Sequence, residues 1–174
     1  FDRNWLEDTG SEDSHGRTLW ALGVCALADA NPSRRAWAAS LFAEVVPTAE
    51  KLRSPRAWAF VLLGLDAYCA ATADDARAIS LRLLFADRLM SILASVETPG
   101  WVWFEEGLSY DNARLPQALI LTGIATGTSA YLAAGLKSLR WLVTQQTSAT
   151  GQFRPVGTEG FADRRKPPRA FDQQ

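Results

Sequence analysis

Acidic and aromatic side chains gather in one stretch of the chain, WVWFEEGLSYDNARLP, which runs from Trp101 to Pro116. Hydrolysis of a glycosidic bond needs two carboxylates about 5–10 Å apart, one on each side of the bond. Glu105 and Asp111 are the two carboxylates that we take as catalytic candidates. Flat aromatic faces such as that of Trp103 can hold a sugar ring. The stretch therefore predicts a carbohydrate-binding or carbohydrate-cleaving surface.

Three further residues of the same stretch are candidate substrate contacts: Tyr110, Asn112 and Arg114. The stretch also has a purely structural interpretation. In that interpretation Asp111 caps the helix that follows, Glu106 is solvated and the tryptophans pack the loop. The residue types alone leave both interpretations open.

A second polar cluster, SEDSHGR, spans Ser11–Arg17. His15 near Asp13 could form a general acid/base pair or bind a sugar hydroxyl. Asp13 is therefore the third catalytic candidate, and His15 and Arg17 are candidate substrate contacts. The alternative is an acidic helix start in which Arg17 pairs with Asp13 or Glu12.

The third candidate segment is GQFRPVG, residues 151–157, whose glycines and proline predict a rigid loop that folds back over the functional surface. Arg154 is its candidate substrate contact. We expect no metal and no cofactor, because His15 is the single histidine and no phosphate-binding glycine loop or metal-ligand spacing is present.

Composition sets the broad class of the protein. The chain has 174 residues, of which 48% are apolar and 21% charged, and a net charge of −1. This balance predicts a globular domain and gives no electrostatic reason to expect a nucleic acid or an anionic membrane as partner. No apolar run reaches membrane-spanning length, and Cys25 and Cys69 match no redox or metal motif, so we expect a cytoplasmic location. The chain begins at Phe1 and stops after AFDQQ, which we expect to be cuts through a longer sequence.

Helical periodicity dominates the chain and almost no strand signal is present. Ser54 followed by Pro55 is a helix-start signal, Asp13 or Ser14 is the expected cap of the first helix, and Pro47 should bend or shorten the second. The expected helices are residues 14–30, 34–52, 56–73, 76–96, 113–126 and 129–147, and residues 148–174 are expected to be mostly loop.

The first, third and fifth of these helices share a pattern. GRTLWALG, PRAWAFVLLG and ARLPQALILTG each place an arginine before a very apolar run that ends in glycine: Gly23, Gly64 and Gly123. These helices should be buried on most sides, and their glycines should let neighbouring helices approach closely. The other three helices carry more charge and fit an outer layer. The pattern predicts one all-α domain over residues 1–174, built of three αα-hairpins.

GSEDSHGRTLWALG, WFEEGLSYDNARLPQALILTG, GQFRPVG and FDQQ resemble the α/α-toroid domain of bacterial carbohydrate-active proteins, often labelled glycosyltransferase and similar in shape to the six-hairpin glycosidases. The resemblance implies an (α/α)6 ring with sugar bound at its centre. This chain supplies three hairpins, which is half of such a ring. The exposed edges of the inner helices therefore predict a homodimer or higher oligomer.

Two functional hypotheses follow. The first is a glycoside hydrolase or glycosyltransferase-associated domain that binds sugar at the rim of the inner helices. The second is a noncatalytic helical module for assembly or glycan binding, including the case of a truncated fragment. The sequence is compatible with both an enzymatic and a noncatalytic role.

Overall fold

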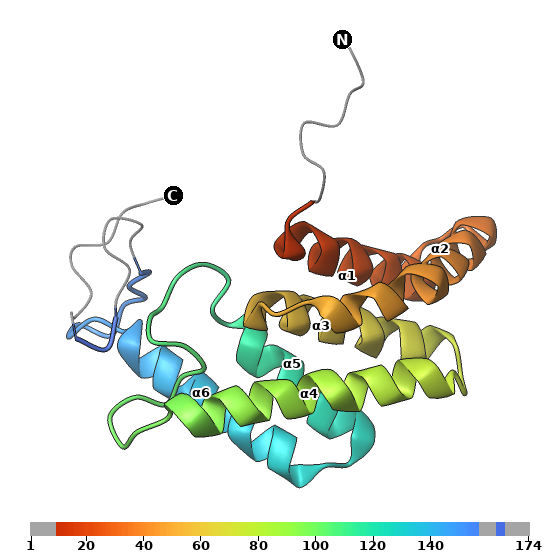
Figure 1. Ribbon diagram of the computed structural model, residues 1–174. Helices are drawn as coiled ribbons and strands as arrows, with labels where there is room; N and C mark the ends of the chain where they lie inside the picture. The colour runs from red at the N-terminus through yellow and green to blue at the C-terminus, as the bar shows by residue number, and fades with distance from the viewer. Residues whose placement is uncertain (1–9, 157–162, 166–174) are drawn as a thin grey trace. The chain divides into compact units, whose positions relative to one another are not determined.

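The computed structural model describes residues 10–156 and 163–165, and over these residues the protein is all-α, as predicted (Figure 1). Only isolated bridges, and no strand, accompany the helices in the described ranges. The helices are α1 (Glu12–Ala28), α2 (Pro32–Val45), the 3₁₀ helix η1 (Val46–Lys51), α3 (Pro55–Ala71), α4 (Ala76–Val96), α5 (Arg114–Thr126) and α6 (Ser129–Gln145).

The helix starts follow from side-chain caps. Ser54 caps α3 and accepts a hydrogen bond from the backbone of Ala57, with Pro55 in the first turn, so this prediction is confirmed. The predicted cap of the first helix was wrong. Ser11 is the cap, because its hydroxyl accepts from the backbone N–H of Ser14 at 3.1 Å, and α1 begins at Glu12.

The second helix is shortened near Pro47, as expected. The α-helical part ends at Val45, and the chain continues as the tighter helix η1 through Lys51. Proline has no backbone N–H to donate to the preceding turn, so an α-helix cannot pass through it undisturbed.

The chain divides into two compact units, Phe1–Leu81 and Arg82–Gln174, and α4 contains the boundary. In the first unit α1 packs against both α2 and α3. The contact with α3 is close because glycines line it: a Cβ on Gly64 would lie 2.6 Å from the carbonyl oxygen of Leu19, and one on Gly16 would lie 2.8 Å from that of Ala57. A Cβ on Gly23 would likewise be too close to the backbone of Gly64. The predicted close approach at Gly23 and Gly64 is confirmed.

Burial differs sharply between α1 and α3. Along α3, eleven residues are buried, which agrees with the predicted inner helix. Along α1, only five are buried: Gly16, Leu19, Leu22, Gly23 and Ala26. The expectation that the first helix is buried on most sides is therefore wrong for the structure described. Its remaining face, including Val24 at 44% exposure, is open.

In the second unit α5 packs against α6. A Cβ on Gly123 would lie 2.5 Å from the backbone nitrogen of Leu132, and one on Gly135 would lie 2.8 Å from the carbonyl oxygen of Pro116. These glycines bring the two helix backbones together. The loop between α4 and α5 supplies further core residues, with Trp103 and Leu108 almost fully buried.

Candidate functional site

The aromatic residues of the loop between α4 and α5 belong to the core of the second unit. Trp103 has no exposed surface, stacks on Trp141 with 5.8 Å between ring centroids and meets Phe104 edge-on at 5.3 Å. The indole N–H of Trp101 donates to the carbonyl oxygen of Glu105 at 2.7 Å. Trp103 therefore presents no open indole face on which a sugar ring could stack in this structure.

The turn before α5 is held by the side chain of Asn112. Its amide oxygen accepts from the backbone N–H of Ser109 at 3.0 Å, and its amide N–H₂ donates to the carbonyl oxygen of Ser109 at 2.9 Å. Asn112 is buried, which suits a residue whose polar atoms are bonded to backbone. It thus supports the turn from within.

Asp111 sits inside this turn with a left-handed backbone, φ 47°. Residues other than glycine adopt this conformation infrequently, and Asp and Asn tolerate it best. The structural interpretation in which Asp111 caps the fifth helix was wrong: α5 begins at Arg114, its N-cap is Ala113, and that cap makes no side-chain hydrogen bond.

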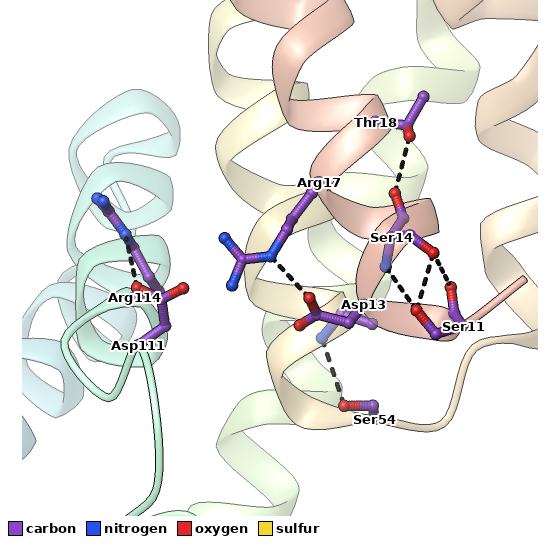
Figure 2. A network of polar contacts seen from close by, with 9 residues as sticks. Ser11, Asp13, Ser14, Arg17, Thr18, Ser54, Asp111 and Arg114 are labelled. Carbon is purple, nitrogen blue, oxygen red and sulfur yellow. Dashed lines mark hydrogen bonds and ion pairs between the residues drawn. The ribbon is translucent and has the colours of Figure 1, made fainter. Parts of the chain in front are cut away.

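Arg114, the first residue of α5, lies beside Asp111. Its Nε is 3.9 Å from Oδ1 of Asp111 (Figure 2). Its Nη1 donates to the side chain of Gln117 at 2.8 Å. Both side chains of the Asp111–Arg114 pair are about one third exposed, at 32% and 35%. A carboxylate and a guanidinium are thus held side by side and reachable from solvent.

These residues line a groove of about 440 Å³ in the second unit. Its walls come from two segments that are distant in sequence, the turn before α5 and the chain after α6. The lining residues are Ser109, Asp111, Asn112, Ala113, Arg114, Gln146, Pro155 and Val156. We refer to this feature as the Asp111 groove.

A tight turn after α6 brings the second wall into place. Gly151 has φ 81° and donates to the carbonyl oxygen of Ser148, and the backbone N–H of Arg154 donates to the carbonyl oxygen of Gln146 at 2.7 Å. Pro155 and Val156 then lie along the groove. The described part of the GQFRPVG segment thus meets the turn before α5, while Gly157 and the FDQQ segment lie outside the described residues.

The acidic residues of the loop do not all meet in the Asp111 groove. Glu105 is half-buried and is not among the groove's lining residues. Glu106 is largely exposed. Its carboxylate lies 3.7 Å from the guanidinium of Arg164, and its backbone carbonyl oxygen accepts the backbone N–H of that arginine. Tyr110 is 49% exposed next to Asp111 in sequence.

The candidates of the first unit form local structural contacts. Asp13 pairs with Arg17 through a 2.7 Å hydrogen bond, as drawn in Figure 2, and the guanidinium of Arg17 lies 4.3 Å from the ring centroid of Phe60. The imidazole Nε2 of His15 is 3.2 Å from the hydroxyl of Thr48 in η1. Asp13 and His15 thus have separate partners in this structure.

Glu12 has a role that the sequence did not reveal. Its carboxylate accepts the backbone N–H groups of Arg53 at 2.8 Å and of Ser54 at 2.6 Å, which ties the start of α1 to the start of α3. In the groove, sequence reasoning also missed Ser109 and Gln146. A single serine or glutamine carries no sequence signal, and Gln146 lies at the C-terminal end of α6, distant in sequence from the turn before α5.

Within the described ranges, no group of three or more His, Cys, Asp and Glu side chains is arranged to hold a metal ion. In the same part of the chain, every helix is too short or too polar to cross a membrane. No protein-family model matches the chain, and no curated protein or solved structure is significantly similar to it.

Proposed function

We propose that the Asp111 groove binds a carbohydrate. The observation that carries the proposal is the pairing of Asp111 and Arg114, both about one third exposed, along a groove of about 440 Å³. That volume lies in the range of small-molecule sites, about 300–1,000 Å³. The family resemblance of the surrounding string, WFEEGLSYDNARLP, supports the same ligand class.

The chemistry of the groove suits a polyhydroxylated ligand. A sugar hydroxyl both donates and accepts, so a site needs both kinds of partner. The carboxylate of Asp111 accepts, the guanidinium of Arg114 donates, and the amide of Gln146 can do either.

Binding is a better match to the groove than hydrolysis. Glycoside hydrolysis uses two carboxylates flanking one bond. Among the described residues that line the groove, Asp111 is the one carboxylate, and Glu105 lies outside that lining. We therefore propose a noncatalytic glycan-binding role for the second unit, in preference to the glycosidase hypothesis.

The finer architecture remains part of this proposal. We propose that the helices form half of an (α/α)6 toroid, in which α1, α3 and α5 are the inner helices. The buried surface of α3 and the glycine contacts at Gly64 and Gly123 support this arrangement. Cross-linking between engineered cysteine pairs on neighbouring inner helices would test it.

Titration calorimetry after a glycan-array screen tests the ligand class. Asp111→Asn keeps a residue that tolerates the left-handed backbone but removes the charge, and Arg114→Gln removes the guanidinium. A hydrogen bond to a charged group contributes about 1.5–3 kcal/mol, so each change should weaken glycan binding by roughly 10- to 100-fold. Wild-type affinity in both variants would contradict the proposal, as would a wild-type protein that binds no glycan on the array.

Glu106→Gln is the matched control. It removes a carboxylate from the same loop, but Glu106 is 71% exposed and lies outside the Asp111 groove, so glycan binding should be unchanged. Trp103→Ala is a poor test of sugar stacking, because it removes a fully buried side chain and should cost about 3–5 kcal/mol of folding free energy.

A further inference from the structure

The charged groups that line the Asp111 groove balance one another. Among its described lining residues, Asp111 carries the one negative charge and Arg114 the one positive charge. Nε of Arg114 lies 3.9 Å from Oδ1 of Asp111, so each charge reduces the field of the other (Figure 2). The other side chains of that lining are uncharged. The described lining of the groove therefore has no net charge.

The start of α5 offers no spare backbone donors to an anion. A helix start commonly binds anions through its unbonded N–H groups. In α5, the N–H groups of Arg114 and Leu115 donate to carbonyl oxygens of the preceding turn at 3.0 and 3.3 Å. Pro116 has no N–H, and the N–H of Gln117 closes the first helical turn. Each N–H of these four residues is thus already bonded to backbone.

The wall that follows α6 adds no positive charge to the described lining. The backbone N–H of Arg154 donates to the carbonyl oxygen of Gln146 at 2.7 Å, and that of Gln146 donates to Leu142 at 2.9 Å. Pro155 has no N–H to donate. The side chain of Arg154 is not among the lining residues. This wall meets a ligand with the amide of Gln146 and with apolar surface.

This arrangement suits a neutral ligand better than an anionic one. Sites for carboxylates and phosphates use guanidinium groups and backbone N–H groups without an opposing carboxylate. An anion bound to Arg114 would lie close to the Asp111 carboxylate, and bringing like charges together is unfavourable. The hydroxyls of a neutral sugar can donate to Asp111 and accept from Arg114 at the same time.

We propose that the Asp111 groove selects neutral saccharides and rejects anionic ones, namely uronates, sugar phosphates and nucleotide sugars. Asp111 is the selecting residue, because the same carboxylate accepts from a hydroxyl and repels an anion. This inference rests on the proposed glycan-binding role and adds the charge of the ligand to it. A nucleotide sugar carries a diphosphate, so the groove does not serve as the donor site of a nucleotide-dependent glycosyltransferase.

Calorimetry of the whole chain with matched pairs of ligands tests the selection. The array should carry neutral, uronate-containing and phosphorylated glycans. Each neutral glucose, galactose or mannose oligosaccharide that binds is then compared with its counterpart in which the C6 hydroxymethyl group is oxidised to a carboxylate. The wild type should bind the neutral member about tenfold or more tightly. Its affinity for that member should hold as NaCl rises from about 0.05 to about 0.5 M, because a neutral ligand has no charge to screen.

Asp111→Asn tests which residue selects. It should weaken binding of the neutral member, which loses its charged acceptor, while the affinity for the uronate stays the same or rises. The preference for the neutral member should therefore fall by about tenfold. Glu106→Gln is the matched control: its carboxylate is 71% exposed and lies outside the groove, so the preference should be unchanged. Circular dichroism should report the same helix content in all three proteins.

The outcomes separate this inference from the proposed function. Equal or tighter binding of the uronate by the wild type would overturn the selection for neutral saccharides, whereas binding lost in Asp111→Asn and Arg114→Gln would still support a glycan site. An unchanged preference in Asp111→Asn would overturn the role of Asp111 as the selecting residue. A wild type that binds no glycan of either kind would overturn the proposed function and this inference together.

Discussion

The side chain of Asn112 is bonded to both polar backbone groups of Ser109, accepting its N–H at 3.0 Å and donating to its carbonyl oxygen at 2.9 Å. This pair of hydrogen bonds closes the turn that leads into α5 and contains Asp111. Asn112 thus supports the proposed glycan site by fixing the backbone that presents the Asp111 carboxylate, and it also lines the groove.

Asn112→Ala should destabilise the second unit. The substitution leaves both backbone groups of Ser109 without their side-chain partner at a buried position, and each lost partner costs about 1–3 kcal/mol where water cannot replace it. We expect a loss of about 2 kcal/mol in urea unfolding. Asn112→Asp keeps the acceptor but loses the donor, so it should also be less stable than the wild type. Wild-type stability in Asn112→Ala would contradict the assigned role.

The left-handed backbone of Asp111 makes a second prediction. At φ 47° glycine is unstrained, whereas alanine has the steric conflict of a Cβ without a polar side chain to offset it. Asp111→Gly should therefore be more stable than Asp111→Ala by about 1 kcal/mol in the same assay. Both variants should lose glycan binding, since both lack the carboxylate. Equal stability of the two variants would show that the turn relaxes once Asp111 is replaced.

Local signals made much of the fold predictable. Ser54 and Pro55 predict the start of α3, because a side-chain oxygen can cap the first turn and proline is tolerated there. Gly23, Gly64 and Gly123 predict close contacts between helices. The start of α1 was harder. The string SEDS offers four oxygen-bearing side chains in a row, and which of them caps depends on backbone angles that the sequence does not state.

The candidate site was only partly predictable, since the same residue types serve a core or a ligand. Trp103 fits a sugar platform and a hydrophobic core equally well by composition, and its burial against Phe104 and Trp141 is decided by tertiary packing. Asn112 looks like a ligand contact until its bonds to Ser109 are seen. Gln146 caps the end of α6 and lines the Asp111 groove although it is distant in sequence from Asp111, which no local pattern predicts.

Gly23→Ala should destabilise the first unit. The added Cβ would meet the backbone of Gly64 on α3, and backbone cannot move aside as a flexible side chain would. Overpacking typically costs about 1–3 kcal/mol or more, while alanine gains about 1 kcal/mol over glycine inside a helix. The net loss should be about 2 kcal/mol in chemical denaturation followed by circular dichroism.

Gly100→Ala is the control for that substitution. A Cβ at Gly100 meets nothing within 4 Å, so its stability should remain within about 0.5 kcal/mol of the wild type. A Gly23→Ala protein as stable as Gly100→Ala would contradict the close contact between α1 and α3.

The turn between α1 and α2 should respond to acid through Asp29. Its side-chain hydrogen bond from Arg34, aided by the backbone N–H of Asn31, lowers the pKa of Asp29 from 3.8 to about 2. Because the pKa is lower in the folded state, the ionised carboxylate stabilises the fold above about pH 4, and this contribution is lost as the pH falls from about 4 to about 2. Thermal unfolding midpoints of the wild type should therefore fall more steeply over that window than those of Asp29→Asn.

Some acid sensitivity should persist in the variant, because hydrogen bonding from the backbone of Ala78 also lowers the pKa of Asp75. Parallel curves for the wild type and Asp29→Asn would show that the Asp29–Arg34 contact does not contribute to folding stability.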